Sequence, residues 1–333
     1  MEQAQEKGLY ARAHAEVMDK LQYCKGKTFT ADDMCRWCGC QNTPEHKEYR
    51  NSIIKVLYNI IYINKIPLLK QRGNLYSLIE KDLDVIQWWQ NPQDIPEFEL
   101  LYPFGEEDNS SFGFEESIKI IPGDLLVLAG ETNRGKTSFL LNLLVNNCEK
   151  YPITYFSSEF NEYKFRERIQ RFPHDKIFDG DKPRFELISR TRNFDDAIAE
   201  RPDNLCIIDW IKLEDDLFKM GAVLGHIKDN LKNGIAVVAL QKRTYKDVGE
   251  GGEGTLDFTD AYFVMSFERL HVIRVKTPKN ITIEGKTFGF KLVEAGTRFH
   301  NIREIKKCSH CYGKGTTARG KCEECLGTGY TDL

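Results

Sequence analysis

The sequence predicts an α/β protein built around a mainly parallel β-sheet. Six apolar runs typical of buried strands alternate with helical segments: LLVLA (125–129), ITYFS (153–157), LCII (205–208), IAVVAL (235–240), AYFVMSF (261–267) and LHVIRV (270–275). Strands separated by helices imply right-handed crossovers and parallel pairing. The residues on either side of this region have a different pattern, which predicts a small N-terminal domain and a cysteine-rich C-terminal module.

Composition places the chain among ordinary globular proteins. Its 333 residues are 41% apolar and 29% charged, enough for two or three domains with a sizeable core. The net charge of -3 gives no global attraction to a polyanion, although a local basic patch can still bind one. No apolar run approaches the roughly 20 residues that span a bilayer. The N-terminus lacks the apolar core of a signal peptide, so we expect a cytoplasmic protein.

Residues 1–90 are predicted to be mostly helical. Leu9, Ala13, Val17 and Leu21 recur every four residues, as on one ridge of a helix. Thr30 followed by Asp33 resembles a capping box that opens a short second helix.

A third helix is predicted over residues 44–64. Thr43-Pro44 supplies a cap and a proline at the first helical position. An apolar stripe at helical spacing follows, made of Tyr49, Ile53, Val56, Leu57 and Ile60. A short hairpin around Arg72-Gly73-Asn74 comes next. Three helices and then a hairpin is the order of a winged helix.

Residues 91–116 have the composition of a linker. They contain Pro92, Pro96 and Pro103 and the stretch EEDNSSFGF. We therefore predict a winged-helix-like domain over 1–90, a linker over 91–116, the α/β domain over 117–305, and a four-cysteine tail over 306–333.

A phosphate-binding loop lies between the first strand and the helix that follows it. Gly130 to Thr137 is GETNRGKT: Gly130, Glu131, Thr132, Asn133, Arg134, Gly135, Lys136 and Thr137. The glycines permit tight turns, so that successive amides face phosphate oxygens. Lys136 is expected to reach the β- and γ-phosphates of a nucleotide such as ATP, and the Thr137 hydroxyl to bind Mg²⁺. The alternative, an incidental glycine-rich turn, does not require this strand-loop-helix context.

Three further polar residues end strands on the same side of the predicted sheet. Asp209 ends LCII, where a second Mg²⁺ ligand is expected. Glu159 follows ITYFS and is the candidate to orient and deprotonate the attacking water. Gln241 ends IAVVAL and is the candidate γ-phosphate sensor. Strand ends on one side of a parallel sheet converge on the ligand, but each residue could instead be an ordinary loop residue.

Residues 114–305 resemble the RecA-type ATPase domain of DnaB-like replicative helicases. The matching stretches are IIPGDLLVLAGETNRGKTSFLLNL, ITYFSSEFNEYKFRERI, NLCIIDWIKL, IAVVALQKR, DFTDAYFVM and VIRVKTPKNITIEGKTFGFKLVEAGTRF. The resemblance implies a phosphate-loop NTPase that acts on DNA, as a helicase or single-stranded DNA translocase in replication or recombination. The alternative is an ATP-gated DNA-binding protein, akin to a helicase loader or a KaiC-like switch, that does not unwind DNA.

The same resemblance implies a hexameric ring or filament in which one subunit supplies a cation to its neighbour's γ-phosphate. The family usually has Lys-x-Arg in this segment. Here Lys276 matches the lysine and Pro278 occupies the arginine position, so that Lys279 or Arg274 is the substitute. An ammonium cannot bridge two oxygens as a guanidinium does.

The family's channel loop, which contacts single-stranded DNA, corresponds to residues 242–254. Its basic start and its glycines suit a loop that follows a nucleic-acid backbone, and Tyr245 could stack on a base. Asp247, Glu250 and Glu253 weaken this interpretation, and an ordinary surface loop is the alternative.

The tail holds two Cys-x2-Cys-x-Gly-x-Gly knuckles, CSHCYGKG (308–315) and CEECLGTG (322–329). The thiolates of Cys308, Cys311, Cys322 and Cys325 can close a tetrahedral shell around one structural Zn²⁺, and His310 is not needed. The tail resembles one half of the cysteine-rich zinc domain of DnaJ chaperones.

The other cysteine cluster, Cys35, Cys38 and Cys40, has no second knuckle. We expect these thiols to pack in a core, with a metal site completed by Cys24 or His46 as the alternative.

The sequence leaves two alternatives for the binding partner of the N-terminal domain. Its third helix offers Lys47, Arg50, Asn51 and Lys55 for a DNA groove, and the hairpin offers Lys70 and Arg72. Residues 1–95 nevertheless hold 13 Lys+Arg against 12 Asp+Glu. Duplex DNA and a protein partner are both consistent with so weak a basic character.

Overall fold

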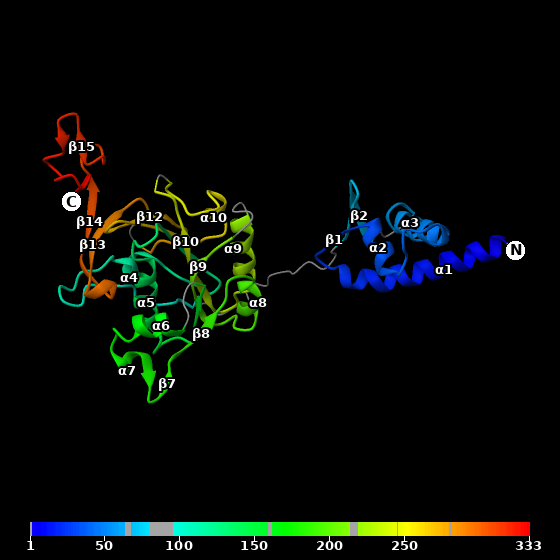
Figure 1. Ribbon diagram of the computed structural model, residues 1–333, viewed down its shortest axis with the longest axis horizontal. Helices are drawn as coiled ribbons and strands as arrows, with labels where there is room; N and C mark the ends of the chain where they lie inside the picture. The colour runs from blue at the N-terminus through cyan, green and yellow to red at the C-terminus, as the bar shows by residue number, and fades with distance from the viewer. Residues whose placement is uncertain are drawn as a thin grey trace. The chain divides into compact units, whose positions relative to one another are not determined.

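The computed structural model describes residues 2–63, 68–79, 96–158, 162–213, 219–244, 246–279 and 282–333. The chain forms two compact units, Met1–Pro92 and Gln93–Leu333, which are described separately (Figure 1). Within the described ranges, no helix has both the length and the apolar character that crossing a membrane would need.

Over residues 2–63 and 68–79, the first unit has three helices and a three-stranded sheet. The helices are α1 (Glu2–Leu21), α2 (Ala31–Trp37) and α3 (Lys47–Tyr62), with short 3-10 turns at Gln22–Cys24 and Pro44–His46. The antiparallel sheet has the order β1-β3-β2, from β1 (Thr28–Thr30), β2 (Leu69–Arg72) and β3 (Leu75–Leu78). Sequence reasoning found the helices and the hairpin. It missed β1, whose three residues are too few to show a strand pattern.

The two predicted helix starts have different outcomes. At α2 the capping box is confirmed: the Asp33 amide donates to Thr30 Oγ1 at 3.1 Å, and the Thr30 amide donates to Asp33 Oδ2 at 2.8 Å. At α3 the predicted start is wrong by three residues, because Pro44 opens a 3-10 turn and the helix begins at Lys47. The Thr43 hydroxyl lies 3.2 Å from His46 Nδ1 and caps no amide. The predicted apolar stripe of α3 is buried throughout.

The second unit is built on a ten-stranded sheet with the order β17-β14-β13-β12-β11-β4-β10-β9-β5-β8. The strands from β11 to β8 are parallel, and the strands from β12 to β17 are antiparallel. The parallel strands are β4 (Leu125–Gly130), β5 (Ile153–Ser157), β8 (Phe185–Ser189), β9 (Leu205–Ile211), β10 (Ile235–Gln241) and β11 (Ala261–Ser266). The antiparallel ones are β12 (Arg269–Val275), β13 (Thr287–Val293), β14 (Arg298–Lys307) and β17 (Tyr330–Asp332).

The remaining elements are short. The helices are α4 (Phe114–Ser117), α5 (Lys136–Asn147), α6 (Glu162–Ile169), α7 (His174–Ile177), α8 (Phe194–Ala199), α9 (Met220–Asp229) and α10 (Gly254–Asp257), with a 3-10 turn at Glu294–Gly296. Two small hairpins pair β6 (Phe178–Asp179) with β7 (Lys182–Pro183) and β15 (Thr316–Thr317) with β16 (Gly320–Lys321).

All six strands expected from apolar runs are present, and the α/β class with its mainly parallel sheet is confirmed. Of the ten strands of this sheet, sequence reasoning missed β8, β13, β14 and β17. Edge strand β8 is largely exposed and alternates polar with apolar residues too weakly to be recognised.

Two hydrophobic clusters cover the two faces of the sheet. On one face α5 contributes Phe139 and Leu143, and they pack with Phe112 and Phe114 of the preceding segment. On the other face α8 and α9 contribute residues such as Leu224. The central strands are therefore buried on both sides, as expected for parallel strands.

The expectation of a linker over 91–116 is wrong for residues 96–116; residues 91–95 lie outside the described residues. Leu100, Tyr102, Phe112 and Phe114 are at most 2% exposed and belong to the core of the second unit. The Asn147 side chain accepts a hydrogen bond from the Leu101 amide at 3.0 Å. Prolines and acidic residues suggested a linker, but the apolar residues between them bury enough area to fix the segment.

The tail continues the main sheet. Strand β14 runs through the predicted boundary between 305 and 306, and β17 returns to pair with it, with Ile305 opposite Asp332. The cysteine knuckles lie between these two strands. Strand β14 therefore connects the tail to the sheet, and β17 forms the edge beside it.

Candidate functional site: a nucleotide cavity and a cysteine cluster

The phosphate loop connects the centre of the sheet to α5. Strand β4 ends at Gly130 and α5 begins at Lys136. Asn133 and Gly135 have φ angles of 57° and 95°, so the loop uses left-handed backbone that asparagine and glycine tolerate best. Lys136 Nζ donates to the carbonyls of Gly130 and Glu131, at 2.9 and 2.8 Å. The Lys136 side chain therefore lies along the phosphate loop, where the expected nucleotide phosphates would bind.

Thr137 and Asp209 meet although 72 residues separate them. Thr137 Oγ1 donates to Asp209 Oδ1 at 3.3 Å. The carboxylate is 2% exposed, and its Oδ2 accepts a hydrogen bond from the Tyr155 hydroxyl at 2.8 Å. A hydroxyl and a carboxylate oxygen are the hard ligands that Mg²⁺ prefers, so these two residues fit the expected metal side of the site. Sequence reasoning missed Tyr155, since a tyrosine in a buried strand has no spacing signal.

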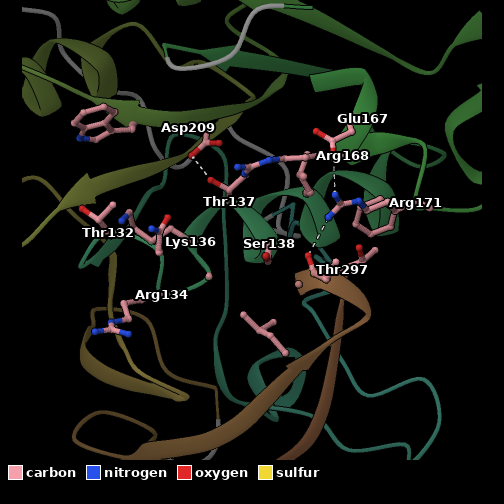
Figure 2. A pocket seen from close by; sticks show the side chains of 18 of the residues that line it. Thr132, Arg134, Lys136, Thr137, Ser138, Glu167, Arg168, Arg171, Asp209 and Thr297 are labelled. Carbon is pink, nitrogen blue, oxygen red and sulfur yellow. Dashed lines mark hydrogen bonds and ion pairs between the residues drawn. The ribbon is translucent and has the colours of Figure 1, made fainter. Parts of the chain in front are cut away.

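These residues line one cavity of about 460 Å³ at the carboxyl ends of the central strands (Figure 2). Thr132, Lys136 and Thr137 come from the phosphate loop and α5, Asp209 from β9, and Gln241 from β10. The Gln241 amide donates to Thr132 Oγ1 at 2.6 Å. The loop, the aspartate and the glutamine predicted from separate stretches are thus brought together.

The opposite wall contains residues that sequence reasoning missed. Figure 2 shows Arg171 between Glu167 and the turn that carries Thr297. Arg171 donates to Glu167 Oε1 at 2.8 Å and to the Ala295 carbonyl at 3.0 Å. Asn142 Nδ2 donates to the Thr297 carbonyl at 2.8 Å and ties this turn to α5. Contact between the turn and α6 depends on tertiary folding, which no local pattern in the sequence reports.

The cavity carries more positive than negative side chains. Arg134, Lys136, Arg168 and Arg171 line it, against Glu167 and Asp209. Arg168 lies near the end of α6 and Arg171 just after it, a pair of nearby cations that could have been noticed once α6 was placed. An excess of cations around a glycine loop suits a polyphosphate ligand.

The expected neighbour-directed cations lie elsewhere in their own subunit. Lys276 Nζ forms an ion pair with Asp260 at 3.3 Å. Lys279 Nζ contacts Glu97 at 2.5 Å and donates to the Glu115 carbonyl at 2.7 Å. Arg274 donates to the Leu256 carbonyl at 2.9 Å. None of the three is among the residues that line the described cavity. A cation that serves the site of a neighbouring subunit would also lie away from the cavity of its own subunit.

Two other sequence-predicted residues, Glu159 and Tyr245, lie outside the described residues. The residues next to them in the chain are described. Ser158 is bonded to β9, and Lys242 is 5% exposed, with its ammonium 3.4 Å from Glu131 Oε1 and 2.9 Å from the Lys246 carbonyl. Lys242 therefore holds the 242–254 loop against the phosphate loop and does not present its charge to solvent.

The strand order and the loop define the class of this unit. It has an α/β fold with a phosphate-binding loop between β4 and α5, and β10 lies between the loop strand β4 and the aspartate strand β9. Among solved structures, one similar chain is a KaiC-like protein of the hyperthermophilic archaeon Pyrococcus horikoshii OT3. Its TM-score is 0.46 and its identity 13%, over 63% of this chain and 99% of that one. No protein-family model matches the sequence, and no curated protein is found to be similar. The fold is therefore assigned from the topology alone.

The tail brings its four cysteines together. The Sγ atoms of Cys308, Cys311, Cys322 and Cys325 all lie within 4.8 Å of one another. The Cys308–Cys322 and Cys311–Cys325 Sγ distances are 3.9 and 3.6 Å. Four thiolates about 2.3 Å from a tetrahedral zinc lie about 3.8 Å apart, so this geometry can hold the expected Zn²⁺.

Glycines let the two knuckles approach each other. The Gly315 and Gly329 amides donate to Cys311 Sγ and Cys325 Sγ, each at 3.2 Å. A Cβ at Gly315 would lie 2.4 Å from the Gly327 carbonyl oxygen, and one at Gly329 equally close to that of Gly313. Burial raises the pKa of the Cys325 thiol, but amide hydrogen bonds, that of Gly329 first, and the neighbouring thiols bring it to about 6. Such donors favour the thiolate that binds metal.

The first-unit cysteines behave differently. Cys24, Cys35, Cys38 and Cys40 are buried in an apolar cluster. Burial raises the pKa values of Cys35 and Cys38 to about 11. In the part of the chain that the structure describes, the four tail cysteines are the one group of three or more His, Cys, Asp or Glu ligands with metal-binding geometry. The first-unit geometry supports core packing for these thiols.

Proposed function

We propose that this protein is a Mg²⁺-dependent ATPase of the RecA/DnaB type that acts on DNA as a helicase or single-stranded DNA translocase. The observation that carries the proposal is the Thr137–Asp209 pair at 3.3 Å, beside Lys136 in one cation-lined cavity. Incidental glycine-rich turns have no reason to place a buried carboxylate against the hydroxyl that follows the lysine.

Each residue has a role that its position supports. Lys136 neutralises the β- and γ-phosphates, while Thr137 and Asp209 would hold Mg²⁺, which supplies charge neutralisation at the phosphoryl group. Gln241 is the candidate γ-phosphate sensor, supported by its hydrogen bond to Thr132 of the phosphate loop. Glu159 is the candidate to orient and deprotonate water, because the residue before it, Ser158, contacts the Asp209 carbonyl through its hydroxyl at 3.3 Å.

DNA is the proposed partner of the second unit, and a homo-oligomer, hexameric by family resemblance, is the proposed assembly. Support for DNA comes from the 242–254 loop, which begins directly after Gln241 and is tied to the phosphate loop by Lys242. Nucleotide state and loop position can therefore be coupled through one buried ammonium. Zn²⁺ at the four tail cysteines is proposed as a structural cofactor.

The first unit has the element order of a winged helix and is proposed to be a targeting module. Of the candidate DNA-reading residues on α3, Arg50 forms an ion pair with Asp32. The same helix exposes Ile54, Tyr58 and Tyr62 at four-residue intervals. This apolar stripe favours a protein partner over a DNA groove, which is rich in charge and hydrogen-bonding groups.

A second candidate function is an ATP-gated DNA-binding or helicase-loader-type protein without unwinding activity. The internal ion pairs of Lys276 and Lys279 favour it, because both cations already have carboxylates in their own subunit. A site that receives no cation from a neighbour is expected to turn over slowly.

The experiment that separates the two is ATP hydrolysis measured with and without single- and double-stranded DNA, alongside unwinding of a forked duplex. The helicase proposal predicts stimulation by single strands and fork opening. DNA binding that depends on ATP, without fork opening, would support the second candidate. An ATP hydrolysis rate that DNA does not change, together with no DNA binding, would contradict both candidate functions.

Subunit sharing is tested by mixing two inactive variants. Lys136→Ala subunits mixed with Lys276→Ala/Lys279→Ala subunits should recover part of the activity, since an intact loop can meet intact lysines across an interface. Activity that is independent of protein concentration, with no recovery on mixing, would show that each site is complete within one chain.

A further inference from the structure

Trp210 occupies an unusual backbone position next to Asp209. Its φ angle is 78°, a left-handed value that bulky residues rarely adopt. In the pairing of β9 with β10, Ile208 lies opposite Val238 and Ile211 opposite Leu240, so that two residues of β9 face one of β10. This is a β-bulge, a device found beside active sites, where it redirects side chains. Strained backbone of this kind persists where the surroundings impose it.

The bulge is held by β5 and by Ser158, the residue that follows it. Ser158 Oγ donates to the Trp210 carbonyl at 2.8 Å and contacts the Asp209 carbonyl at 3.3 Å. Within β5, the Tyr155 hydroxyl donates a hydrogen bond to the Asp209 carboxylate. Both residues of the bulge are therefore fixed by β5 and the residue that follows it, Asp209 through its side chain and Trp210 through its backbone.

Trp210 is one of the residues that line the nucleotide cavity, and its indole N–H is unsatisfied. Nε1 is buried, and among the described residues no acceptor lies within hydrogen-bonding distance of it. The indole nitrogen can only donate. Buried donors almost always have acceptors, so an exception in the wall of a ligand cavity calls for an explanation. A phosphate oxygen is the acceptor that this cavity is built to receive.

We propose that Trp210 belongs to the nucleotide site and that its indole N–H donates a hydrogen bond to an oxygen at the γ-phosphate end of the bound triphosphate. This inference rests on the proposed function. Trp210 directly follows the metal-side Asp209 and lines the same cavity as Lys136 and Thr137, which puts it near the expected phosphate end. Because Nε1 is closed off from solvent in this conformation, the bond forms with a rotation of the indole when the triphosphate binds.

The consequence is discrimination between nucleoside triphosphate and diphosphate. A donor that contacts only the terminal phosphate adds affinity for the former and none for the latter. Removing a hydrogen bond to a charged group weakens binding by about tenfold to a hundredfold. Trp210→Phe keeps an aromatic ring and removes the N–H, so it isolates this contact.

The test is calorimetric binding of the non-hydrolysable analogue AMP-PNP and of ADP, each with Mg²⁺, to the full chain. In Trp210→Phe, affinity for AMP-PNP should fall at least about tenfold, while affinity for ADP changes by less than about twofold. Trp37→Phe, in the first unit, is the matched control and should change neither. In the wild type, AMP-PNP should also shift the tryptophan fluorescence, and this shift should vanish in Trp210→Phe and persist in Trp37→Phe.

Equal losses for both nucleotides, or no loss for either, would overturn the proposal, because Trp210 would then only support the fold or do nothing at the phosphates. Should Trp210→Phe fail to fold, the wild-type fluorescence decides: a response to ADP as large as that to AMP-PNP overturns the inference. Failure of the proposed function is distinct, since the wild-type chain would then bind neither nucleotide.

Discussion

The nucleotide cavity and the cysteine tail hold their functional side chains in opposite ways. The cavity residues stand at the ends of β4, β9 and β10, whose own apolar residues are almost completely buried. In the tail, the buried cluster consists of Cys308, Cys311, Cys322 and Cys325 alone. In the cavity, a separate hydrophobic core positions the functional residues. In the tail, the four cysteines are themselves the buried core.

This difference teaches what a substitution should do in each place. A cavity residue can be replaced with loss of chemistry and little loss of structure, since the sheet stays buried without it. A tail cysteine cannot be replaced so selectively, because metal-binding free energy is folding free energy where no apolar core exists. The first-unit cysteines form a third case, thiols that act as small apolar side chains.

The largest structural effect is expected from removing the proposed zinc. The purified chain should carry close to one zinc, and a strong chelator or Cys322→Ser should unfold the tail between β14 and β17. Because thiolates must be deprotonated to bind metal, zinc should also be lost on acidification. Elemental analysis, with exchange of the tail amides followed by mass spectrometry, measures both.

The matched control is Cys35→Ser in the first unit, which should leave the zinc content unchanged. Freshly reduced protein without zinc would contradict the metal centre. Two zincs per chain, one of them lost in Cys35→Ser, would break the comparison by making the first cluster a metal site as well.

A large effect on chemistry alone is expected at Glu159. Glu159→Gln should bind ATP and hydrolyse it at least about 100-fold more slowly, the usual scale for a general base. Its melting temperature should stay close to that of the wild type, in contrast to the tail variant. Steady-state hydrolysis and binding of a fluorescent ATP analogue provide the two measurements. Normal turnover in this variant would mean that another residue orients the water.

The smallest expected effect concerns Asp108, which fastens the 96–116 segment to β14. Its carboxylate accepts hydrogen bonds from Ser110 Oγ at 2.6 Å and from the Asn301 amide at 2.6 Å. These bonds, with Ser110 first, lower the pKa of Asp108 from 3.8 to about 2. A carboxyl group with a lowered folded-state pKa stabilises the fold above its unfolded pKa, and that stability is lost as pH falls from about 4 to about 2.

Asp108→Asn should therefore melt below the wild type at pH 7, and the difference should narrow as pH falls through this window. Calorimetric melting of both proteins from pH 7 to pH 3 measures it. Zinc loss in acid affects both proteins alike and cancels in the difference. A gap that stays constant over the whole range would show that the Asp108 charge does not hold the segment.

Much of this architecture follows from local sequence. The six apolar runs gave all six strands, and the capping box of Thr30 and Asp33 gave the start of α2, because burial and capping are decided by neighbouring residues. The phosphate loop and the cysteine knuckles were found for the same reason: each concentrates its chemistry in eight consecutive residues whose spacing is itself the signal.

What could not be predicted depends on contacts between distant segments. Residues 96–116 have the composition of a linker, yet Phe112 and Phe114 find a complementary face only after β13, β14 and α5 assemble. Tyr155 holds Asp209 from a buried strand, Arg171 contacts the turn after β13, and Trp210 lies in a bulge. None of these arrangements has a sequence period. The roles of Lys276 and Lys279 depend on a second subunit, which one chain does not define.

The central claim is that Lys136, Thr137 and Asp209 form one Mg²⁺-triphosphate site. Its most direct test is Mg²⁺-dependent ATP hydrolysis by the wild type, Lys136→Ala and the matched control Lys150→Ala, a lysine just beyond α5 that pairs with Glu99 on the surface. Hydrolysis should be lost in Lys136→Ala, with the melting temperature and zinc content retained, and should persist in Lys150→Ala. Undiminished, Mg²⁺-dependent turnover by purified Lys136→Ala would contradict the account.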